Sequence, residues 1–463
     1  MRVLKLGAMK TKKQKDFEQM PVVNAKAAGI DVGSKTHFVA VGQQKDEVRE
    51  FGCYTSELHE LCNWLMEHSI TKVALESTGS YWQPLFIMLQ AYGLEPILVN
   101  GRFTKNVKGR KTDVLDCQWI QKLHSLGLLE GSFIPDLFTE TLRQYCRHRQ
   151  SLLENAASYI SKMQKALRMT NIRLDVAVSD ITGVSGKMII EAIISGEKDP
   201  VVLASLVKYK VKKSKEEIIK ALTGEWREEY IFELRQCYEV YNYFHGKIAE
   251  CDKHIEAHLN QRIEDNEKLD GEARIEYLGK DKYLNKNDPK MNLQRISYQL
   301  TGGVDLSVIA GVGSTTIITL LSETGIDLSA FPTARHFTSW LRLAPNKKVS
   351  GGRVISSRTL KGKSRLADAL RHVAVAVGNR LKEGSLHQFY RRIAYRKGKL
   401  AAVTATARKI AVIIYNMLTK RQAYKPIAET EYLEKIRMAQ VKAMQRRINQ
   451  LGVRPDELIF ASC

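Results

Sequence analysis

The sequence contains no long apolar run and no paired cysteines. No segment approaches the roughly 18 consecutive apolar residues of a transmembrane helix, and the N-terminus lacks the apolar segment of a secretory signal. The seven cysteines are scattered without a C-x-x-C pair, which fits neither a zinc site nor a disulfide framework. We therefore expect a soluble cytoplasmic protein with reduced, mostly buried thiols and no membrane partner.

Acidic residues are scarce in the last third of the chain. The net charge is +22, and residues 331–463 hold 28 Lys and Arg against seven Asp and Glu, so +21 of it lies there. One-sided charge of this density usually marks a polyanionic partner. Nucleic acid is favoured over an acidic membrane, because the basic stretch is rich in predicted helix and has no long amphipathic terminal anchor.

The first part of the chain alternates between predicted strands and helices. Strands are expected in the opening stretch 28–41, in "KVALE" and in "PILVN", and helices at 56–68, at 82–92 and from Thr112. Such alternation favours an α/β domain with a largely parallel sheet. At 463 residues the chain should form two or three domains.

The middle of the chain changes to helical periodicity. Apolar residues follow three-and-four spacing from Leu142 to Met169 and again from Trp226 to Ile263, where Asp252 interrupts a heptad register. Two such helices predict an antiparallel or intersubunit coiled coil, with 265–290 as a loop.

Two glycine-bearing turns, in 181–193 and 309–321, each precede a predicted helix. They resemble helix-hairpin-helix turns that bind phosphate, and a plain turn between helices is an equally good interpretation of the first.

Asp31, within "AGIDVGSKTHFVAV", suits either an ATPase phosphate loop or metal-dependent cutting of nucleic acid. The ATPase would need a second Asp-Gly-Gly loop and a Gly-rich adenosine loop, and the sequence has neither. The "SGG" at Ser350 lacks both the acid and the preceding strand. Nucleic-acid cutting is therefore the better hypothesis.

Three further acids fit that hypothesis. Glu76 ends the predicted strand "KVALE", and Asp113 and Asp116 share a helix face at i, i+3 spacing, with Cβ atoms about 5–6 Å apart. Separate surface acids are the plain alternative. In a partly buried cluster, unit charges about 4 Å apart would repel by about 4 kcal/mol per pair at an effective dielectric of 20, so the cluster would require a cation. Oxygen ligands favour Mg²⁺ or Mn²⁺.

The segment "PNKKVSGGRVISSR" places Ser350 before two glycines and among cations. Glycines let a phosphate backbone approach, and the serine offers a hydroxyl. A simple turn remains the alternative, since no base stands beside the serine. The residues expected to contact phosphates are Arg110, Lys111, Lys347, Lys348, Arg353, Arg358, Lys361, Lys363 and Arg365.

The blocks "GIDVGSKTHFVAV", "ALESTGSYWQPLFIMLQAYGLEPILVN" and "KGRKTDVLDCQWIQKLHSLGLL" resemble the N-terminal DEDD domain of the insertion-sequence transposases of the one-ten family. The block from Val308 to Gly378 resembles that family's C-terminal transposase domain, although "WLRLAP" departs from its more common Gly before Leu. The resemblance implies a RuvC-like domain with an RNase H-like fold. It carries the four acids onto Asp31, Glu76, Asp113 and Asp116, and the nucleophile onto Ser350, with Ser356 and Ser357 as further candidates.

The resemblance also implies the partners: target and donor DNA, a structured noncoding bridge RNA that pairs with both, and further copies of the chain. Acids of one subunit would meet the serine of another in a dimer of dimers, in the bacterial or archaeal nucleoid. A junction resolvase and a non-catalytic RNA-binding scaffold are the alternatives. The expected domains are a basic flexible arm (1–26), a RuvC-like DEDD domain (27–138), a helical coiled-coil arm (139–300), a mainly helical transposase domain with the serine (301–424) and a basic helical tail (425–463).

Overall fold

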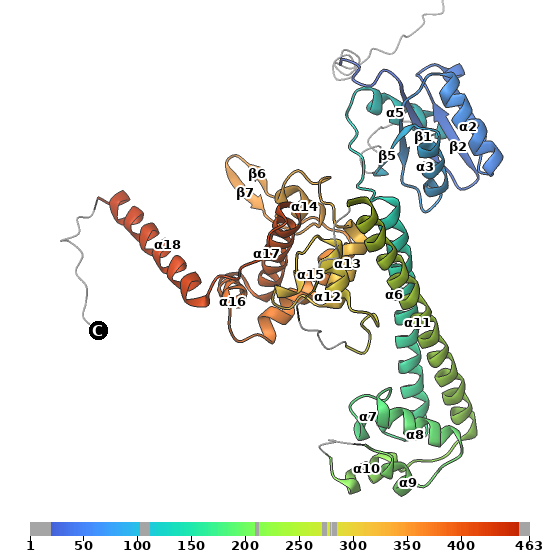
Figure 1. Ribbon diagram of the computed structural model, residues 1–463, viewed down its shortest axis with the longest axis vertical. Coiled ribbons are helices and arrows are strands. Elements are labelled where there is room, and N and C mark those ends of the chain that lie inside the picture. The colour runs from blue at the N-terminus through green and yellow to red at the C-terminus, as the bar shows by residue number, and fades with distance from the viewer. Residues whose placement is uncertain are drawn as a thin grey trace, which may run out of the picture. The chain divides into compact units, whose positions relative to one another are not determined.

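The computed structural model describes residues 20–101, 112–208, 213–270, 276–277, 279 and 285–452. The chain divides into two compact units, Met1–Ile134 and Pro135–Cys463, with a mixed α/β unit first and a mostly helical unit second (Figure 1).

Unit 1 is built on a five-stranded sheet with the order β3-β2-β1-β4-β5. β2 runs antiparallel to β1 and to β3, whereas β4 is parallel to β1 and β5 is parallel to β4. The strands are β1 (Ala27–Val32), β2 (Thr36–Ala40), β3 (Val48–Gly52), β4 (Lys72–Glu76) and β5 (Glu95–Val99), with a short 3-10 turn, η1 (Lys45–Glu47), before β3. The sheet is therefore mixed.

The prediction of a largely parallel sheet was wrong because the first three strands were misread. The opening stretch forms two strands, separated by a tight turn in which the Gly33 N–H donates to the Thr36 carbonyl at 3.0 Å. The edge strand β3 was not predicted, since its exposed Arg49 and Glu50 give it little apolar pattern.

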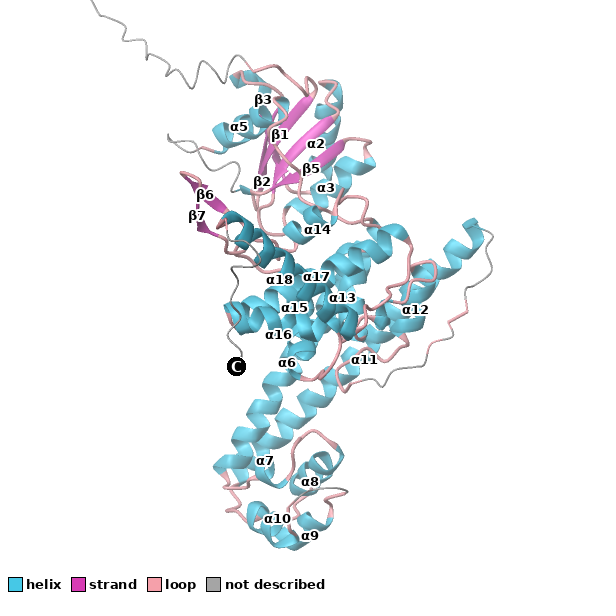
Figure 2. Ribbon diagram, turned by 90° about the vertical axis from the view of Figure 1, so that its left-hand side faces the viewer, coloured by secondary structure: helices cyan, strands magenta, loops and turns pink. Residues whose placement is uncertain are grey.

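Helices cover both faces of this sheet (Figure 2). α2 (Thr55–Glu67) and α3 (Trp82–Ala91) pack on the face that carries Ile30 and Leu75, and α5 (Asp113–Ser125) packs on the face that carries Ala74. These three helices were expected, and each begins and ends within a residue or two of the predicted bounds where a bound was predicted.

Unit 2 begins with a long helical hairpin, the arm, made of α6 (Leu137–Met169) and α11 (Glu228–Asp270). Phe138 stacks on His258 with ring centroids 4.3 Å apart, and Tyr159 contacts Phe244 at 5.8 Å, so the two helices run antiparallel. The two long helices are confirmed, although α11 continues to Asp270, so residues 265–270 are helical and not part of a loop.

Four short helices fill the far end of the arm and share one apolar core with it. They are α7 (Leu174–Ala177), α8 (Val184–Ile194), α9 (Pro200–Ser205) and α10 (Lys215–Leu222). α8 starts directly after Gly183, and α13 starts directly after Gly313, so both expected turn-to-helix transitions are present.

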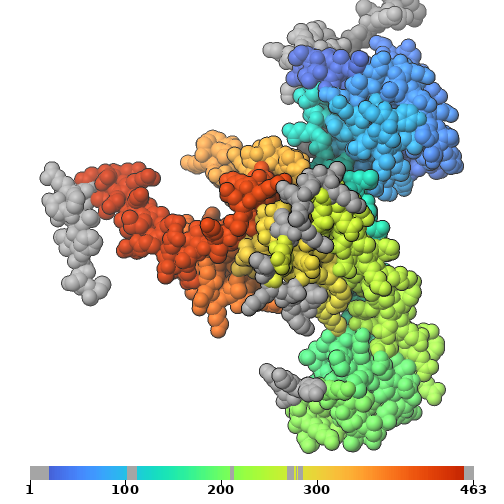
Figure 3. Space-filling model, in the orientation of Figure 1, coloured from blue at the N-terminus to red at the C-terminus, as the bar shows by residue number. Residues whose placement is uncertain are grey.

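The rest of unit 2 is a helical body with one small hairpin of strands. Its elements are α12 (Leu293–Leu300), η2 (Leu306–Val308), α13 (Ser314–Thr324), α14 (Ala334–Trp340), β6 (Lys348–Ser350), β7 (Arg353–Ser356), α15 (Arg365–Asn379), α16 (Ser385–Lys397), α17 (Lys399–Lys420) and α18 (Glu429–Gln450). α18 projects from this body in Figure 3, and only Tyr432 of its side chains is buried.

α17 lies at the centre of this body. It packs against α14, α15 and α16, and the Tyr415 hydroxyl donates to the Phe331 carbonyl at 2.7 Å. Among the described residues it is the one helix long and apolar enough to span a membrane by length and composition. Its buried stripe against three helices accounts for much of that apolar character.

The described cysteines are free thiols, as expected. Most are buried, Cys146 is half-buried and Cys53 is exposed.

Candidate functional site

Two of the predicted acids lie at the same edge of the sheet in unit 1. β1 and β4 are parallel, and continuing their register by one position pairs Asp31 with Glu76. Side chains alternate along a strand, so both acids lie on the same face as Gly29 and Ala74, which is the face covered by α5.

Gly29 explains how α5 comes so close to that edge. A Cβ added at Gly29 would lie 2.2 Å from the Gln121 backbone nitrogen and 2.5 Å from the Cys117 carbonyl oxygen. Only glycine allows the helix backbone to pack directly on β1. The Gln121 side-chain amide also donates to the Ala27 carbonyl at 3.1 Å, which ties the helix to the strand.

The remaining two acids stand in the first turn of α5. Thr112 is the N-cap, and its hydroxyl accepts from the Leu115 N–H at 3.3 Å. Asp113 and Asp116 follow directly, where the positive end of the helix dipole favours negative charge.

The thiol of Cys117 in α5 lies close enough to acids of both β1 and α5 for their charges to shift its pKa. Burial is the main cause that raises the pKa of Cys117 to about 12, and the carboxylates of Asp31 and Asp116 contribute to that rise. The charge on β1 and a charge on α5 therefore both lie close to the same thiol.

The donor chemistry of these four acids fits a hard divalent cation such as Mg²⁺ or Mn²⁺. In the part of the chain that the structure describes, no three His, Cys, Asp or Glu side chains are arranged to hold one metal ion together. The predicted phosphate contacts Arg110 and Lys111 lie outside the described residues. The structure thus brings acids to one edge of the sheet, and their role as metal ligands stays a prediction.

Ser350 lies in unit 2, at the end of the hairpin formed by β6 and β7. Gly351 and Gly352 are the two central residues of the turn, and their φ angles are 54° and 75°. Two-residue hairpin turns of type I′ require positive φ at both of these positions. Ser350 pairs with Arg353 across this turn, and every residue of β6 is exposed. Ser350 is therefore exposed to solvent at the C-terminal end of β6.

The loop that carries this hairpin is held mainly by backbone contacts. Pro345 and Thr359 form an isolated bridge, and the Asn346 N–H donates to the Arg358 carbonyl at 3.0 Å. The Ser356 hydroxyl accepts from the Arg358 N–H, so that serine has a structural partner. The predicted phosphate contacts of this loop are all exposed: Lys347, Lys348, Arg353, Arg358, Lys361 and Lys363.

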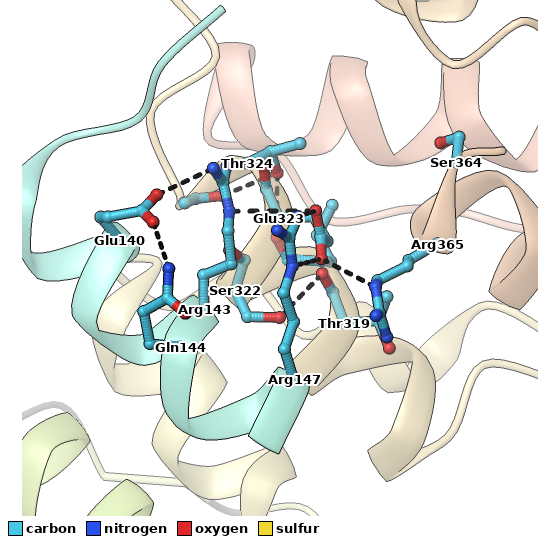
Figure 4. Close-up of polar contacts among 12 residues, drawn as sticks. Glu140, Arg143, Gln144, Arg147, Thr319, Ser322, Glu323, Thr324, Ser364 and Arg365 are labelled. Carbon is cyan, nitrogen blue, oxygen red and sulfur yellow. Dashed lines mark hydrogen bonds and ion pairs between the residues drawn. The ribbon is translucent and has the colours of Figure 1, made fainter. Parts of the chain in front are cut away.

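Arg365 differs from those cations because it faces a carboxylate. Glu323 lies in the last turn of α13 with a side chain only 11% exposed, and Arg147 of the arm binds it at 2.9 Å (Figure 4). The Arg365 guanidinium lies 4.0 Å from the same carboxylate. Sequence reasoning missed Glu323, since its partners are distant in the sequence.

Two family models match the chain, one in each unit's site region. Residues 28–172 match a model described as a transposase of the DEDD, IS110 type, and residues 305–391 match one described as Transposase IS116/IS110/IS902 family. The first segment contains the four acids and the second contains Ser350 and its cations. No curated protein matches the chain.

Together the two matched segments cover half of the sequence and describe the same kind of protein. A transposase cuts and rejoins DNA, so the chain is an enzyme that acts on DNA, and the DEDD type implies dependence on a divalent metal in general. The chain belongs to the IS110 family of transposases.

Proposed function

We propose that this transposase moves its own insertion sequence by a serine-recombinase reaction, using an acidic cluster on a RuvC-like, RNase H-like domain together with Ser350. The observation that carries the proposal is the position of Asp31 and Glu76 on one face at one edge of the sheet, with Asp31 and Asp116 both acting on the thiol of Cys117 in α5. The strand order β3-β2-β1-β4-β5, in which β2 alone runs opposite to the other four strands, supports the fold assignment.

Asp31, Glu76, Asp113 and Asp116 would hold Mg²⁺, with Mn²⁺ as an alternative. The bound metal would polarise the scissile phosphate and favour ionisation of a nearby hydroxyl. The Ser350 Oγ loses its proton and forms a bond to phosphorus, while the bond from phosphorus to the 3′ oxygen breaks and that oxygen takes up a proton. A 3′ hydroxyl from another strand reverses this step and rejoins the DNA.

The cations around Ser350 would neutralise the phosphates of the DNA. Lys347, Lys348 and Arg353 flank the serine on an exposed hairpin, which supports this role. Arg110, Lys111, Arg358, Lys361, Lys363 and Arg365 complete the proposed phosphate contacts.

A noncoding bridge RNA would choose the target and donor DNA by base pairing, leaving the protein to hold backbones. The acids of one subunit would act with Ser350 of another in a dimer of dimers associated with the nucleoid. The location of the acids and of Ser350 in two separate compact units supports such a composite site.

The test is the covalent protein–DNA species. Ser350→Ala should abolish the SDS-stable complex with labelled DNA, and Ser357→Ala, a change at an exposed serine of the same loop, should leave it intact. Loss of the complex in Ser357→Ala alone would move the nucleophile to that residue. Continued cutting by Ser350→Ala, with no covalent species in the wild type, would establish a resolvase instead.

The acidic cluster is tested separately. Asp113→Asn should lower the rate of covalent complex formation by about 10²–10³-fold, the loss typical of removing one group that stabilises developing charge. Full transposition by Asp113→Asn would instead support a non-catalytic, RNA-binding scaffold.

A further inference from the structure

α16 and α17 form a helical hairpin without acidic residues, the basic hairpin (residues 385–420). The two helices pack against each other (Figure 1). Gly398, with φ of 84°, is the single residue between them, and the chain turns a corner there. This segment has no Asp or Glu, and its cations are Arg391, Arg392, Arg396, Lys397, Lys399, Arg408, Lys409 and Lys420. A surface with charge of one sign attracts a polyanion.

Two of these cations serve the packing of the hairpin against α18. Arg392 lies over the rings of Phe389 and Tyr432 at 5.7 and 5.9 Å, and Lys409 lies over the same rings at 4.6 and 5.1 Å. Burial lowers the pKa of Lys409, and the neighbouring Arg392 lowers it further. These two groups are structural, which separates them from the cations at the corner.

The corner presents unpartnered groups to solvent. Tyr395 is 94% exposed, and Leu400 on the other side of Gly398 is 87% exposed. Within the described part of the chain, neither a ring nor a cation contacts the Tyr395 ring. Within the same part, no carboxylate forms an ion pair with Arg396, Lys397 or Lys399, all of which are exposed.

Sites that bind single-stranded nucleic acid combine aromatic side chains, on which bases stack, with cations that contact the phosphates. The corner has both. Bases of a single strand are free to stack on aromatic side chains, and each stacked base contributes about 1–3 kcal/mol by alanine substitution. In a duplex the bases are already stacked, so an exposed ring has no base face to cover. Leu400 extends the apolar surface beside the ring.

We propose that the corner of the basic hairpin binds single-stranded nucleic acid, with Tyr395 stacked on a base and Arg396, Lys397 and Lys399 on its phosphates. The corner lies beyond residue 391, where the second family match ends, and apart from the loop that carries Ser350. The inference rests on the proposed function for one point, the source of the single strand, which would be either the guide RNA or DNA that is unpaired during strand exchange.

Fluorescence anisotropy of the full-length protein tests the site with three labelled probes: a uridine oligomer of about 12 nucleotides, its thymidine equivalent and a duplex of the same length. Tyr395→Ala should weaken binding of a single strand by roughly 5- to 150-fold, which corresponds to the stacking energy above. Duplex binding should change by less than about twofold. Tyr395→Phe should retain single-strand binding, because the ring face and not the hydroxyl makes the contact.

The uridine and thymidine probes distinguish RNA from DNA as the source of the strand. Arg396→Ala with Lys399→Ala should lower the salt slope of single-strand binding by about 1.4, or about 0.7 for each lost phosphate contact. Tyr243→Ala is the matched control, since Tyr243 is a 62% exposed tyrosine on the arm. Photocrosslinking with 5-iodouracil probes should recover a peptide that contains Tyr395.

Equal binding of single strands by Tyr395→Ala and the wild type would overturn the inference, as would an equal loss in Tyr395→Phe. A change in oligomeric mass on Tyr395→Ala, with all nucleic-acid binding intact, would assign the corner to a protein partner. Ser350→Ala separates the two proposals, because it should lose the covalent complex and keep the Tyr395-dependent binding. If the wild type forms no covalent complex but that binding persists, the proposed chemistry fails and the single-strand site stands.

Discussion

One buried ion pair should determine the stability of the arm. Arg149 of α6 and Asp252 of α11 are 7% and 4% exposed, and the Arg149 Nε lies 2.5 Å from a carboxylate oxygen of Asp252. The Arg149 guanidinium also donates to the Asn287 carbonyl at 3.1 Å, and the Lys290 N–H donates to Asp252 at 3.2 Å. The pair therefore joins both long helices to residues 285–292.

Removing one member of such a pair leaves the other charge buried without compensation. Asp252→Ala should therefore destabilise the arm by about 3–5 kcal/mol. Replacing both charges, by Arg149→Met with Asp252→Leu, should restore most of that loss, because an apolar pair of similar volume needs no compensation. The cost arises from the unpaired charge and not from the missing contact.

Hydrogen exchange of the full-length protein, followed by mass spectrometry, measures this loss within the arm alone. Amides of α6 and α11 near the pair should exchange at least about 100-fold faster in Asp252→Ala, at 1.4 kcal/mol for each factor of ten. Glu250→Ala is the control on the same helix: its partner Lys247 is 41% exposed, and such exposed pairs contribute about 1 kcal/mol or less. Equal exchange in Asp252→Ala and Glu250→Ala would refute the reasoning.

Two predictions concern unit 1. Gly29→Ala should displace α5 and raise hydrogen exchange throughout that helix, because the new Cβ would lie 2.2 Å from the Gln121 backbone nitrogen. The control is Gly246→Ala in the arm, at a helical glycine with nothing within 4 Å, which should stabilise the arm by about 0.5–1 kcal/mol. Unchanged protection of α5 in Gly29→Ala would contradict the close packing. Burial, with a smaller contribution from the positive charge of Lys72, lowers the pKa of His124 to about 4. The unfolded chain then binds this proton first, so His124 should cost unit 1 about 2 kcal/mol of stability between pH 7 and pH 5. Hydrogen exchange, corrected for intrinsic rates, should show this loss, which His124→Leu should remove and exposed His68→Leu should not; buried His37, whose pKa is also lowered, keeps its own contribution in both variants. A pH-independent wild type would contradict the buried state.

The sequence predicted the elements whose pattern is local. α2, α3 and the two helices of the arm have apolar faces with helical periodicity, and their burial follows that periodicity. β3 was missed because an edge strand with two adjacent charges carries little alternation. The opening stretch was misread as one strand, although Gly33 and Ser34 supply a turn signal there.

Contacts between residues that are distant in the sequence could not be predicted from residue spacing. Asp252 was visible only as an interruption of a heptad register, since its partner Arg149 is 103 residues away in the sequence. In the candidate site, too, the local features could be predicted and the long-range contacts could not. The acids at strand ends were predictable, but the approach of α5 depends on Gly29, whose requirement becomes clear only when the helix lies on the strand.

Charge is used in two different ways in unit 2, and burial decides which. In the arm, cations such as Arg149 and Arg147 are bound to carboxylates, so their charge fixes how α6 packs on its neighbours. The basic hairpin itself contains no Asp or Glu, and its exposed cations at the corner are screened by water and salt and are not bound to a carboxylate within the described residues. The cations that flank Ser350 and Tyr395 are exposed, so a polyanion can reach them. Neutralising arm cations should affect folding first, whereas neutralising corner cations should affect the salt dependence of nucleic-acid binding first.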